Sequence, residues 1–321
     1  MVRAKFMLGL ALVLVASRAT AQTASDTIEA TSLLGKPLAR PRLSERVRAD
    51  YQAKLDSAAR AYARAYGADG TGGTGAERDP DLIIWLGRRT AYLGRFREAI
   101  GIFSRGIALH PTDARFYRHR GHRYLTIRRI DDAIRDLERA DQLTRNQPDQ
   151  VELDGLPNAR GIPTSTLQSN IRYHLGLAYY LKGDFVRAAD LFRRDVAAAV
   201  NPDMVVASSH WLYMALRRAG RVNEAERVLA AITPDMEVIE NQSYHRLLLM
   251  YKGALSANDV APKDRDDAVQ DATVLYGIAN WHWYHGRKAS ARKMFEQIMV
   301  LPQWGAFGFL AAEAELGRMR R

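Results

Sequence analysis

The chain has 321 residues, of which 47% are hydrophobic and 26% charged, proportions of a globular protein and not of a disordered one. Lys and Arg number 47 and Asp and Glu 36, so the net charge is +11. Because the chain contains no Cys, its composition excludes disulfides, thiolate metal sites, iron–sulfur clusters, a catalytic Cys and a lipid-modified N-terminal Cys.

Residues 1–21 predict an export signal. Arg3 and Lys5 give a positive start, residues 6–16 are apolar, and a small-x-small pattern ends at Ala21, so we expect cleavage between Ala21 and Gln22. An uncleaved anchor is the alternative, but the apolar run would span about 16 Å as a helix, against a hydrocarbon core of about 30 Å. Cleavage removes three basic residues and leaves +8 (11 − 3). The sequence therefore predicts an exported protein, periplasmic or secreted, with no transmembrane segment in its mature form.

The next two segments precede the main pattern. Residues 22–43 show no clear period and predict a flexible leader. From Ser44, a suitable N-cap, apolar residues recur at i+3 and i+4 up to Gly67, which predicts an N-terminal capping helix. The Gly-rich stretch 70–75 lacks a GKS or GKT ending and is typical of a linker rather than a phosphate loop. We therefore take 44–79 as capping helix and linker.

From Pro80 a motif recurs five times. Each copy has an anchor residue at a turn, a small residue five positions later and a large apolar residue nine positions later. The first two anchors are 34 residues apart. The anchors are Gly94, Arg128, Gly183, Gly220 and Gly286; the small residues are Ala99, Ala133, Ala188, Ala225 and Ala291; the large residues are Phe103, Leu137, Phe192, Leu229 and Phe295.

A 34-residue helix–turn–helix unit with small residues at fixed places resembles the tetratricopeptide repeat (TPR) family. The resemblance implies an all-α, right-handed superhelical solenoid of TPR-like repeats over 80–321, with a C-terminal capping helix at 306–319. An irregular helical bundle is the alternative, but five units in phase favour the repeat. Two segments break the period. One is the insert at 144–168. The other, 240–271, has an apolar helix followed by a polar stretch with Pro262, and our hypothesis is a decayed repeat.

In the TPR family the first helix of each pair lines a concave groove, so the resemblance implies which side chains would face a partner. Arg offers paired donors to carboxylate or phosphate, and Tyr and Trp offer large contact areas. We therefore expect a protein or peptide partner with acidic and apolar side chains; for any single position, solvation or packing between units is the alternative. The implied groove residues are Arg88, Tyr92, Arg115, Arg118, His122, Asn170, Tyr173, Tyr180, His210, Arg217, Tyr276, Asn280 and Trp283.

The insert is acidic and follows a unit rich in Arg and His. Loops of this length in compact domains are usually functional or disordered. One hypothesis is that it folds over the concave face beside Arg115, Arg118 and His122 and narrows the groove. The other is an excursion into solvent without a role.

Other functions find weaker support. The pairs His119/His122 and His282/His285 have a spacing that can share a metal, but neither has a nearby acidic third ligand in sequence, so no metal and no cofactor are expected. No catalytic signature is present, which argues against an enzyme. Aromatic residues do not interleave with a Lys/Arg run, so nucleic acid is not expected, whereas the positive charge allows association with an anionic envelope surface. The alternatives are a protein that binds an anionic polymer or envelope glycan and, less favoured, an enzyme with a site under the insert.

Overall fold

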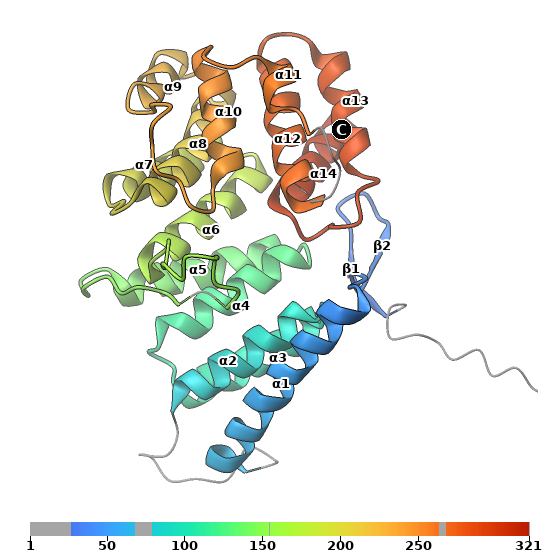
Figure 1. Ribbon diagram of the computed structural model, residues 1–321, viewed down its shortest axis with the longest axis vertical. Coiled ribbons are helices and arrows are strands. Elements are labelled where there is room, and N and C mark those ends of the chain that lie inside the picture. Colours follow the sequence, from blue (N-terminus) through green and yellow to red (C-terminus); the bar gives the residue numbers. More distant parts are fainter. Residues whose placement is uncertain (1–26, 68–78, 154, 263–267, 321) are drawn as a thin grey trace, which may run out of the picture.

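The protein is built almost entirely of helices. We describe residues 27–67, 79–153, 155–262 and 268–320 of a computed structural model (Figure 1). The strands are β1 (Ile28–Thr31) and β2 (Pro37–Ala39), and the helices are α1 (Glu45–Tyr66), α2 (Pro80–Tyr92), α3 (Phe96–Leu109), α4 (Ala114–Thr126), α5 (Ile130–Thr144), α6 (Leu167–Lys182), α7 (Phe185–Ala197), α8 (Pro202–Arg218), α9 (Val222–Leu229), α10 (Gln242–Lys252), α11 (Ala257–Val260), α12 (Ala268–Tyr284), α13 (Lys288–Ile298) and α14 (Phe307–Met319). The predicted all-α repeat fold is confirmed.

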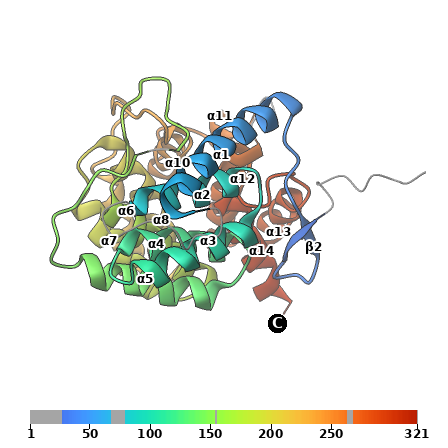
Figure 2. The same ribbon diagram turned by 90° about the horizontal axis from the view of Figure 1, so that it is seen from below.

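Five antiparallel helix pairs form the body of the molecule: α2–α3, α4–α5, α6–α7, α8–α9 and α12–α13 (Figure 1 and Figure 2). Each predicted anchor lies in the turn of one pair and has a positive φ, between 67° and 85°. Gly adopts this conformation freely, whereas another residue loses about 1–2 kcal/mol. Within the described ranges Arg128 is the one non-Gly residue with a positive φ, so some other interaction must hold it there.

In the first three pairs the two helices approach closely because a Gly on the first helix faces a large side chain on the second. A Cβ at Gly176 would lie 2.8 Å from the Phe192 ring, and one at Gly121 would lie 2.8 Å from Leu137. Gly87 faces Phe103 in the same way. Phe103, Leu137 and Phe192, large residues of the sequence motif, therefore fill the space that these glycines leave.

Gly176→Ala is expected to lower the free energy of unfolding by about 1–3 kcal/mol, because the added methyl overlaps the Phe192 ring and core overpacking has that cost. Gly101→Ala is the matched control, since it also lies within a helix, α3, but has open space around its Cβ position. That change is expected to stabilise the protein by about 0.5–1 kcal/mol. Urea unfolding of both variants measures the difference; equal shifts of the same sign would contradict this account of the packing.

The segment 240–271 also contains a helix pair, with a shortened second helix. α10 packs between α8 and α12, the place of a first helix in the stack. Gly253 at its end has a φ of 86°, like the turns of the regular pairs. α11 then has four residues. This geometry is that of a reduced repeat unit.

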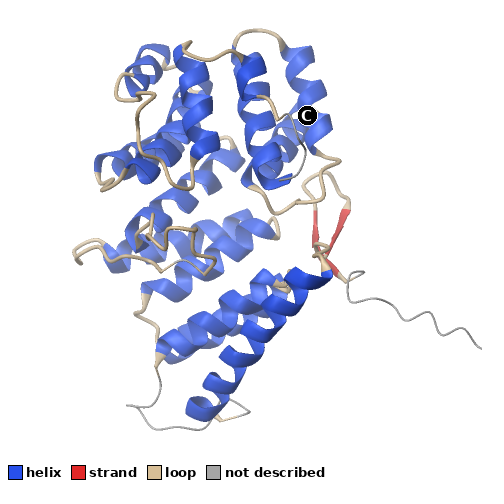
Figure 3. Cartoon of the chain, viewed as in Figure 1, coloured by secondary structure: helices blue, strands red, loops and turns tan. Residues whose placement is uncertain are grey.

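The N-terminal part differs from the prediction. The expected flexible leader at 22–43 is wrong for residues 28–39, which form an antiparallel hairpin of β1 and β2 (Figure 3). Glu29 is 3% exposed; its carboxylate pairs with Arg40 at 2.9 Å and accepts from the Arg97 backbone N–H at 3.1 Å. The hairpin is therefore fixed to the start of α3. Its strands are too short to show a period in the sequence.

α1 is the helix expected from Ser44. The Ser44 hydroxyl accepts a hydrogen bond from the Val47 N–H, Gly67 follows the last turn, and the helix packs on α2. The predicted signal at 1–21 and the Gly-rich stretch 70–75 lie outside the described residues. In the described ranges no helix combines the length and the apolar character needed to cross a membrane.

The C-terminal helix α14 packs between α6, α12 and α13. It carries two buried carboxylates. Glu313, 0% exposed, pairs with Arg128 at 2.7 Å and accepts from the Leu33 backbone N–H of the hairpin. Glu315 pairs with Arg218, at the end of α8, at 2.6 Å. α14 thus joins the N-terminal hairpin, the second pair and the fourth pair, and its carboxylate is what keeps Arg128 in a turn where Gly would be easier.

Candidate functional site

The first helices of the first four pairs form one surface, which we call the inner face. α2 contacts α4, α4 contacts α6, and α6 contacts α8. The resemblance to TPR proteins placed ten of the thirteen candidate binding residues on these helices and the other three, Tyr276, Asn280 and Trp283, on α12. Their positions in the structure divide them into three groups: buried residues, residues around a pocket, and residues elsewhere.

Four of the candidates are buried. Tyr180, His210, Tyr276 and Asn280 are 0–1% exposed. The Tyr180 and Tyr276 hydroxyls lie 2.8 Å apart, and the Asn280 amide donates to Tyr180 at 2.9 Å. His210 stacks on Tyr244 of α10 with ring centroids 4.7 Å apart. The expectation that these four face an open groove is wrong, because α10 covers His210 and the other three contact one another where α6 meets α12.

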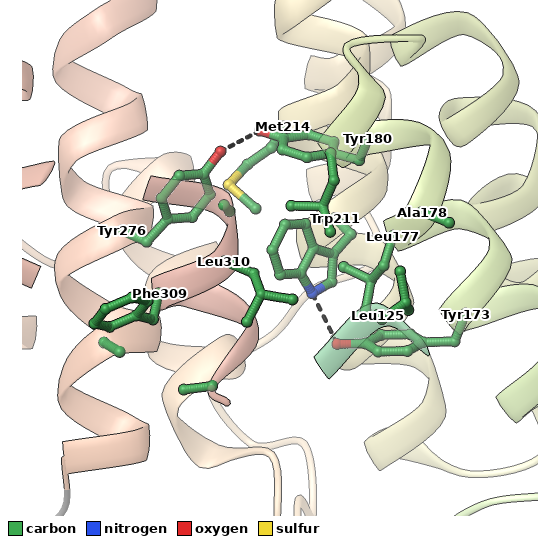
Figure 4. Packing of buried hydrophobic residues seen from close by; sticks show 14 of the residues in the cluster. Leu125, Tyr173, Leu177, Ala178, Tyr180, Trp211, Met214, Tyr276, Phe309 and Leu310 are labelled. Atoms are coloured by element: carbon green, nitrogen blue, oxygen red, sulfur yellow. Dashed lines mark hydrogen bonds between the residues drawn. The ribbon is translucent and has the colours of Figure 1, made fainter. Parts of the chain in front are cut away.

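A large aromatic side chain, which the sequence did not single out, lies at the centre of this packing. Trp211 is 1% exposed and lies beside Leu310 of α14 (Figure 4). Its indole N–H donates to the Tyr173 hydroxyl at 2.8 Å, and that hydroxyl also lies 3.0 Å from the Tyr244 hydroxyl. Tyr173, another candidate, is 9% exposed and therefore belongs mainly to the core.

At the other end of the inner face lies a cavity of about 150 Å³, which we call the arginine–histidine pocket. Five of the candidates meet there: Arg88, Tyr92, Arg118, His122 and Asn170. The remaining lining comes from α2, α3, α4 and the insert: Ala91, Phe103, His119, Arg123, Glu152 and Ser165.

The insert, which connects α5 to α6, places a carboxylate in this pocket. Glu152 Oε2 lies 3.0 Å from Arg118 Nε and accepts from the Asn170 side-chain amide at 3.2 Å. Its other oxygen is 3.8 Å from His119 Nε2. The side chains of Arg118 and Glu152 are 9% and 12% exposed. The predicted contact of the insert with Arg118 is therefore present.

The backbone of the insert also contacts the inner face. Arg88 Nη1 donates to the Leu153 carbonyl at 2.8 Å, and Arg89 Nη1 donates to the Gly155 carbonyl at 2.7 Å. Gly155 lies directly on Tyr92: a Cβ there would overlap the Tyr92 hydroxyl and lie 2.6 Å from Tyr92 Cζ. The insert thus covers the pocket through backbone carbonyls and one carboxylate.

The pocket holds more positive than negative charge. Arg88, Arg118 and Arg123 face it, and Glu152 supplies the one carboxylate among its described lining residues. The structure describes no hydrogen bond or ion pair of the Arg123 side chain; its guanidinium lies 5.7 Å from the centre of the Phe96 ring. Burial lowers the pKa of Arg123 to about 10, and the positive charges of Arg118 and Arg88 contribute. An anion entering the pocket would relieve this repulsion.

The histidines around the pocket are neutral at neutral pH. Burial holds the pKa of His119, His122 and His174 well below the usual value, and neighbouring arginines add to the effect. The His122 and His174 rings are 4.2 Å apart, and His119 Nδ1 lies 3.0 Å from Arg118 Nη1. No group of three His, Asp or Glu side chains in the described ranges is placed to hold a metal ion. The chemistry that this arrangement offers is hydrogen bonding and charge pairing with an anion.

The other three candidates lie apart from the pocket. Arg115 pairs with Asp113 at 2.6 Å and lines a more open cavity of about 510 Å³. Arg217 donates to the Tyr213 hydroxyl at 2.9 Å. Trp283 lies under the Lys288 ammonium, 5.3 Å from its ring centre. The structure does not bring these three to one site with Arg118.

Sequence reasoning missed three residues at or beside the pocket. Arg123 follows His119 by four positions, which places both on one side of α4, and this spacing could have indicated it. His174 follows Asn170 in the same way. Glu152 carried no such signal, because its position depends on how the insert folds.

A second cavity, of about 260 Å³, adjoins the pocket. Both are lined by Ser165 and Asn170. The second is further lined by Tyr173, His174 and Phe307, which give it a more aromatic wall. A ligand longer than one side chain could therefore extend from the first cavity towards the second.

The chain resembles several solved structures at low sequence identity. No protein-family model and no curated protein sequence matches the chain. Among solved structures, it resembles YrrB, a TPR protein with an unusual peptide-binding site, at 15% identity over 74% of this chain and 92% of that one, with a TM-score of 0.39. It resembles a mutant of MamA at 19% identity over 58% and 95%, TM-score 0.37. It also resembles a Podosopora anserina protein with nearly identical TPR-like repeats at 18% identity over 71% and 97%, TM-score 0.41.

Proposed function

We propose that the chain is an exported repeat scaffold that binds an acidic segment of a protein partner at the arginine–histidine pocket. The supporting observation is that Arg88, Arg118 and Arg123 face one cavity with a single described carboxylate, Glu152. Arginine is the side chain best suited to paired hydrogen bonds with a carboxylate. The stacked helices hold these donors in place before a ligand arrives, which reduces the entropy lost on binding.

The surroundings of the pocket favour a peptide as the carrier of the acidic group. Tyr92 and Phe103 provide aromatic walls, which suit apolar side chains beside the carboxylate. Arg88 and Arg89 donate to backbone carbonyls of the insert, and a partner backbone offers the same acceptors. The adjoining second cavity gives room for the residues that follow.

A pull-down from envelope extract with residues 22–321 tests the proposal. Wild type is expected to retain a discrete protein that Arg123→Gln loses, because Arg123 is the pocket guanidinium for which the structure describes neither a hydrogen bond nor an ion pair. Arg115→Gln is the matched control, since it lies on the same helix, α4, outside the pocket, and is expected to retain the same protein. Equal retention by all three forms would place the binding surface elsewhere.

The same variants distinguish the alternatives. An anionic polymer or envelope glycan would bind with a steep dependence on salt, because many exposed charges contribute. Loss of that binding in Arg123→Gln, with no protein retained by any form, would support the polymer. Chemical conversion of the bound molecule, followed by mass spectrometry, would support an enzyme with its site under the insert.

Export makes a separate prediction. Mass spectrometry of the extracytoplasmic fraction is expected to find a mature chain that begins at Gln22. Ala21→Arg is expected to prevent cleavage, because the position before the cut requires a small residue. Ala24→Arg, three residues further on, is the control and is expected to be cleaved normally. A full-length chain in wild-type membranes would indicate an uncleaved anchor.

A further inference from the structure

Glu152, Leu153 and Gly155 of the insert contact the inner face as a bound peptide would. The helices supply the donors. Arg88 and Arg89 donate to the carbonyls of Leu153 and Gly155. Arg118 and Asn170 bind the Glu152 carboxylate. The insert supplies the acceptors, two carbonyls and the Glu152 side chain. This division of roles is the one found when an extended segment binds a preformed surface.

The apolar side chains of the insert contribute little to holding it there. Val151, Leu153 and Leu156 are 60%, 61% and 47% exposed. Burial of apolar area, the main source of a loop's attachment to a core, is therefore small in this part of the insert. The segment is held mainly by polar contacts, which a ligand with the same groups can replace.

The ends of the insert are fixed independently of the pocket. Val151 forms an isolated antiparallel bridge with Thr166, and Asp149 accepts from the Thr166 hydroxyl at 2.7 Å. On the other limb, Thr164 and Asn158 both donate to the Glu240 carboxylate. The Glu152 N–H belongs to this base, since it donates to the Ser165 carbonyl at 3.1 Å. The Glu152 side chain and the carbonyls of Leu153 and Gly155 can therefore leave the pocket while the base stays in place.

We propose that Glu152, Leu153 and Gly155 are an internal substitute for the partner segment, and that the partner carries a carboxylate followed three residues later by Gly. The inference rests on the proposed function of the pocket. The carboxylate is required by Arg118 and Asn170, which bind the Glu152 oxygen. Tyr92 favours the Gly, because a Cβ at position 155 would overlap the Tyr92 hydroxyl and force that side chain to move.

The insert competes strongly with any external segment, since its tether holds it at high local concentration. The apparent affinity for a partner is therefore the intrinsic affinity multiplied by the fraction of molecules in which the insert has left the pocket. Weakening the contact of the insert should raise the affinity for an external segment.

The test uses a fluorescent peptide with the sequence of residues 150–160 and measures its anisotropy with purified residues 22–321. Gly155→Ala and Glu152→Gln are expected to bind it at least about tenfold more tightly than wild type, because each weakens the internal competitor. Leu156→Ala, an exposed side chain of the same insert, is the control and is expected to match wild type. Circular dichroism checks that all four chains have the same helix content.

The peptide itself carries the second half of the test. With the Gly155→Ala chain, a peptide with Glu152→Gln or with Gly155→Ala is expected to bind at least about tenfold more weakly than the original, a loss of about 1.4 kcal/mol or more. Equal affinity of the chains, or indifference to the two peptide changes, would overturn the inference.

Failure of the inference is distinct from failure of the proposed function. If the pull-down retains a protein in an Arg123-dependent way while the peptide binds none of the chains, the pocket binds another kind of segment and this inference is wrong. If the pull-down shows no dependence on Arg123 and the peptide does not bind, the proposed function is wrong as well.

Discussion

Lowering the pH from about 7.5 to about 5.5 is expected to reduce the free energy of unfolding by about 5 kcal/mol. The cause is four buried histidines, His119, His122, His174 and His210, whose pKa burial lowers; for His210 it falls to about 3. The unfolded chain binds a proton at each near pH 6.5, whereas the folded chain does not. The stability that each neutral histidine contributes is therefore fully present above that pH and is lost as the pH falls. One pH unit below, the loss is about 1.4 kcal/mol per histidine.

Urea unfolding at several pH values measures this loss. His210→Phe is expected to reduce the pH dependence by about a quarter, since it removes one of four equivalent terms. The ring nitrogens of His210 have no described hydrogen-bond partner, so Phe replaces the ring without breaking one. His285→Phe, on an exposed residue, is the control and should keep the full dependence. Constant stability across this range would show that the histidines are solvated.

Glu313→Ala is expected to lower the free energy of unfolding by about 3–5 kcal/mol, the usual loss when one partner of a buried ion pair is removed. The change leaves the Arg128 guanidinium, whose side chain is 3% exposed, without its carboxylate. It also removes the acceptor of the Leu33 backbone N–H. Chemical denaturation monitored by circular dichroism measures the effect.

Two further variants identify the cause. Glu296→Ala breaks a pair with Arg292 whose members are 55% and 60% exposed, and it is expected to lower stability by less than about 1 kcal/mol. Arg128→Gly combined with Glu313→Leu removes both charges and the unfavourable φ of residue 128, so it is expected to recover most of the loss. If Glu313→Ala lowers the free energy of unfolding no more than Glu296→Ala does, the buried Arg128–Glu313 pair does not have the stabilising role that we assign to it.

Local features of the sequence were sufficient to predict the helix pairs. The turn residues Gly94, Gly183, Gly220 and Gly286 require a left-handed backbone, and this requirement is visible in one unit. The match of Gly176 to Phe192 is likewise a contact within one pair. Such short-range constraints repeat along the chain, so the repeat could be recognised.

The packing of α14 could not be predicted in this way. Glu313 pairs with Arg128, 185 residues away, and Glu315 pairs with Arg218, 97 residues away. In the sequence both glutamates look like ordinary polar residues of a surface helix. Tyr180 of α6 and Tyr276 of α12 likewise contact each other across 96 residues of sequence, so both were placed on the wrong surface.

The candidate site was predicted where it depends on the repeat and missed where it depends on the insert. Arg88, Arg118 and His122 lie on the first helices of neighbouring pairs, and the repeat geometry brings them together. Arg115 lies on the same helix as Arg118 but pairs with Asp113 near the helix start, outside the pocket. The role of Glu152 depends on the path of the insert, which no repeat pattern specifies.

The bond between the hairpin and α14 has a consequence for how the chain can evolve. Open repeat arrays gain or lose units easily, because each unit contacts only its neighbours. Here Glu313 must reach both Arg128 and Leu33, so adding or deleting one helix pair would separate the two ends. The joined ends therefore fix the number of units, and divergence is confined to substitutions and to changes in loop length.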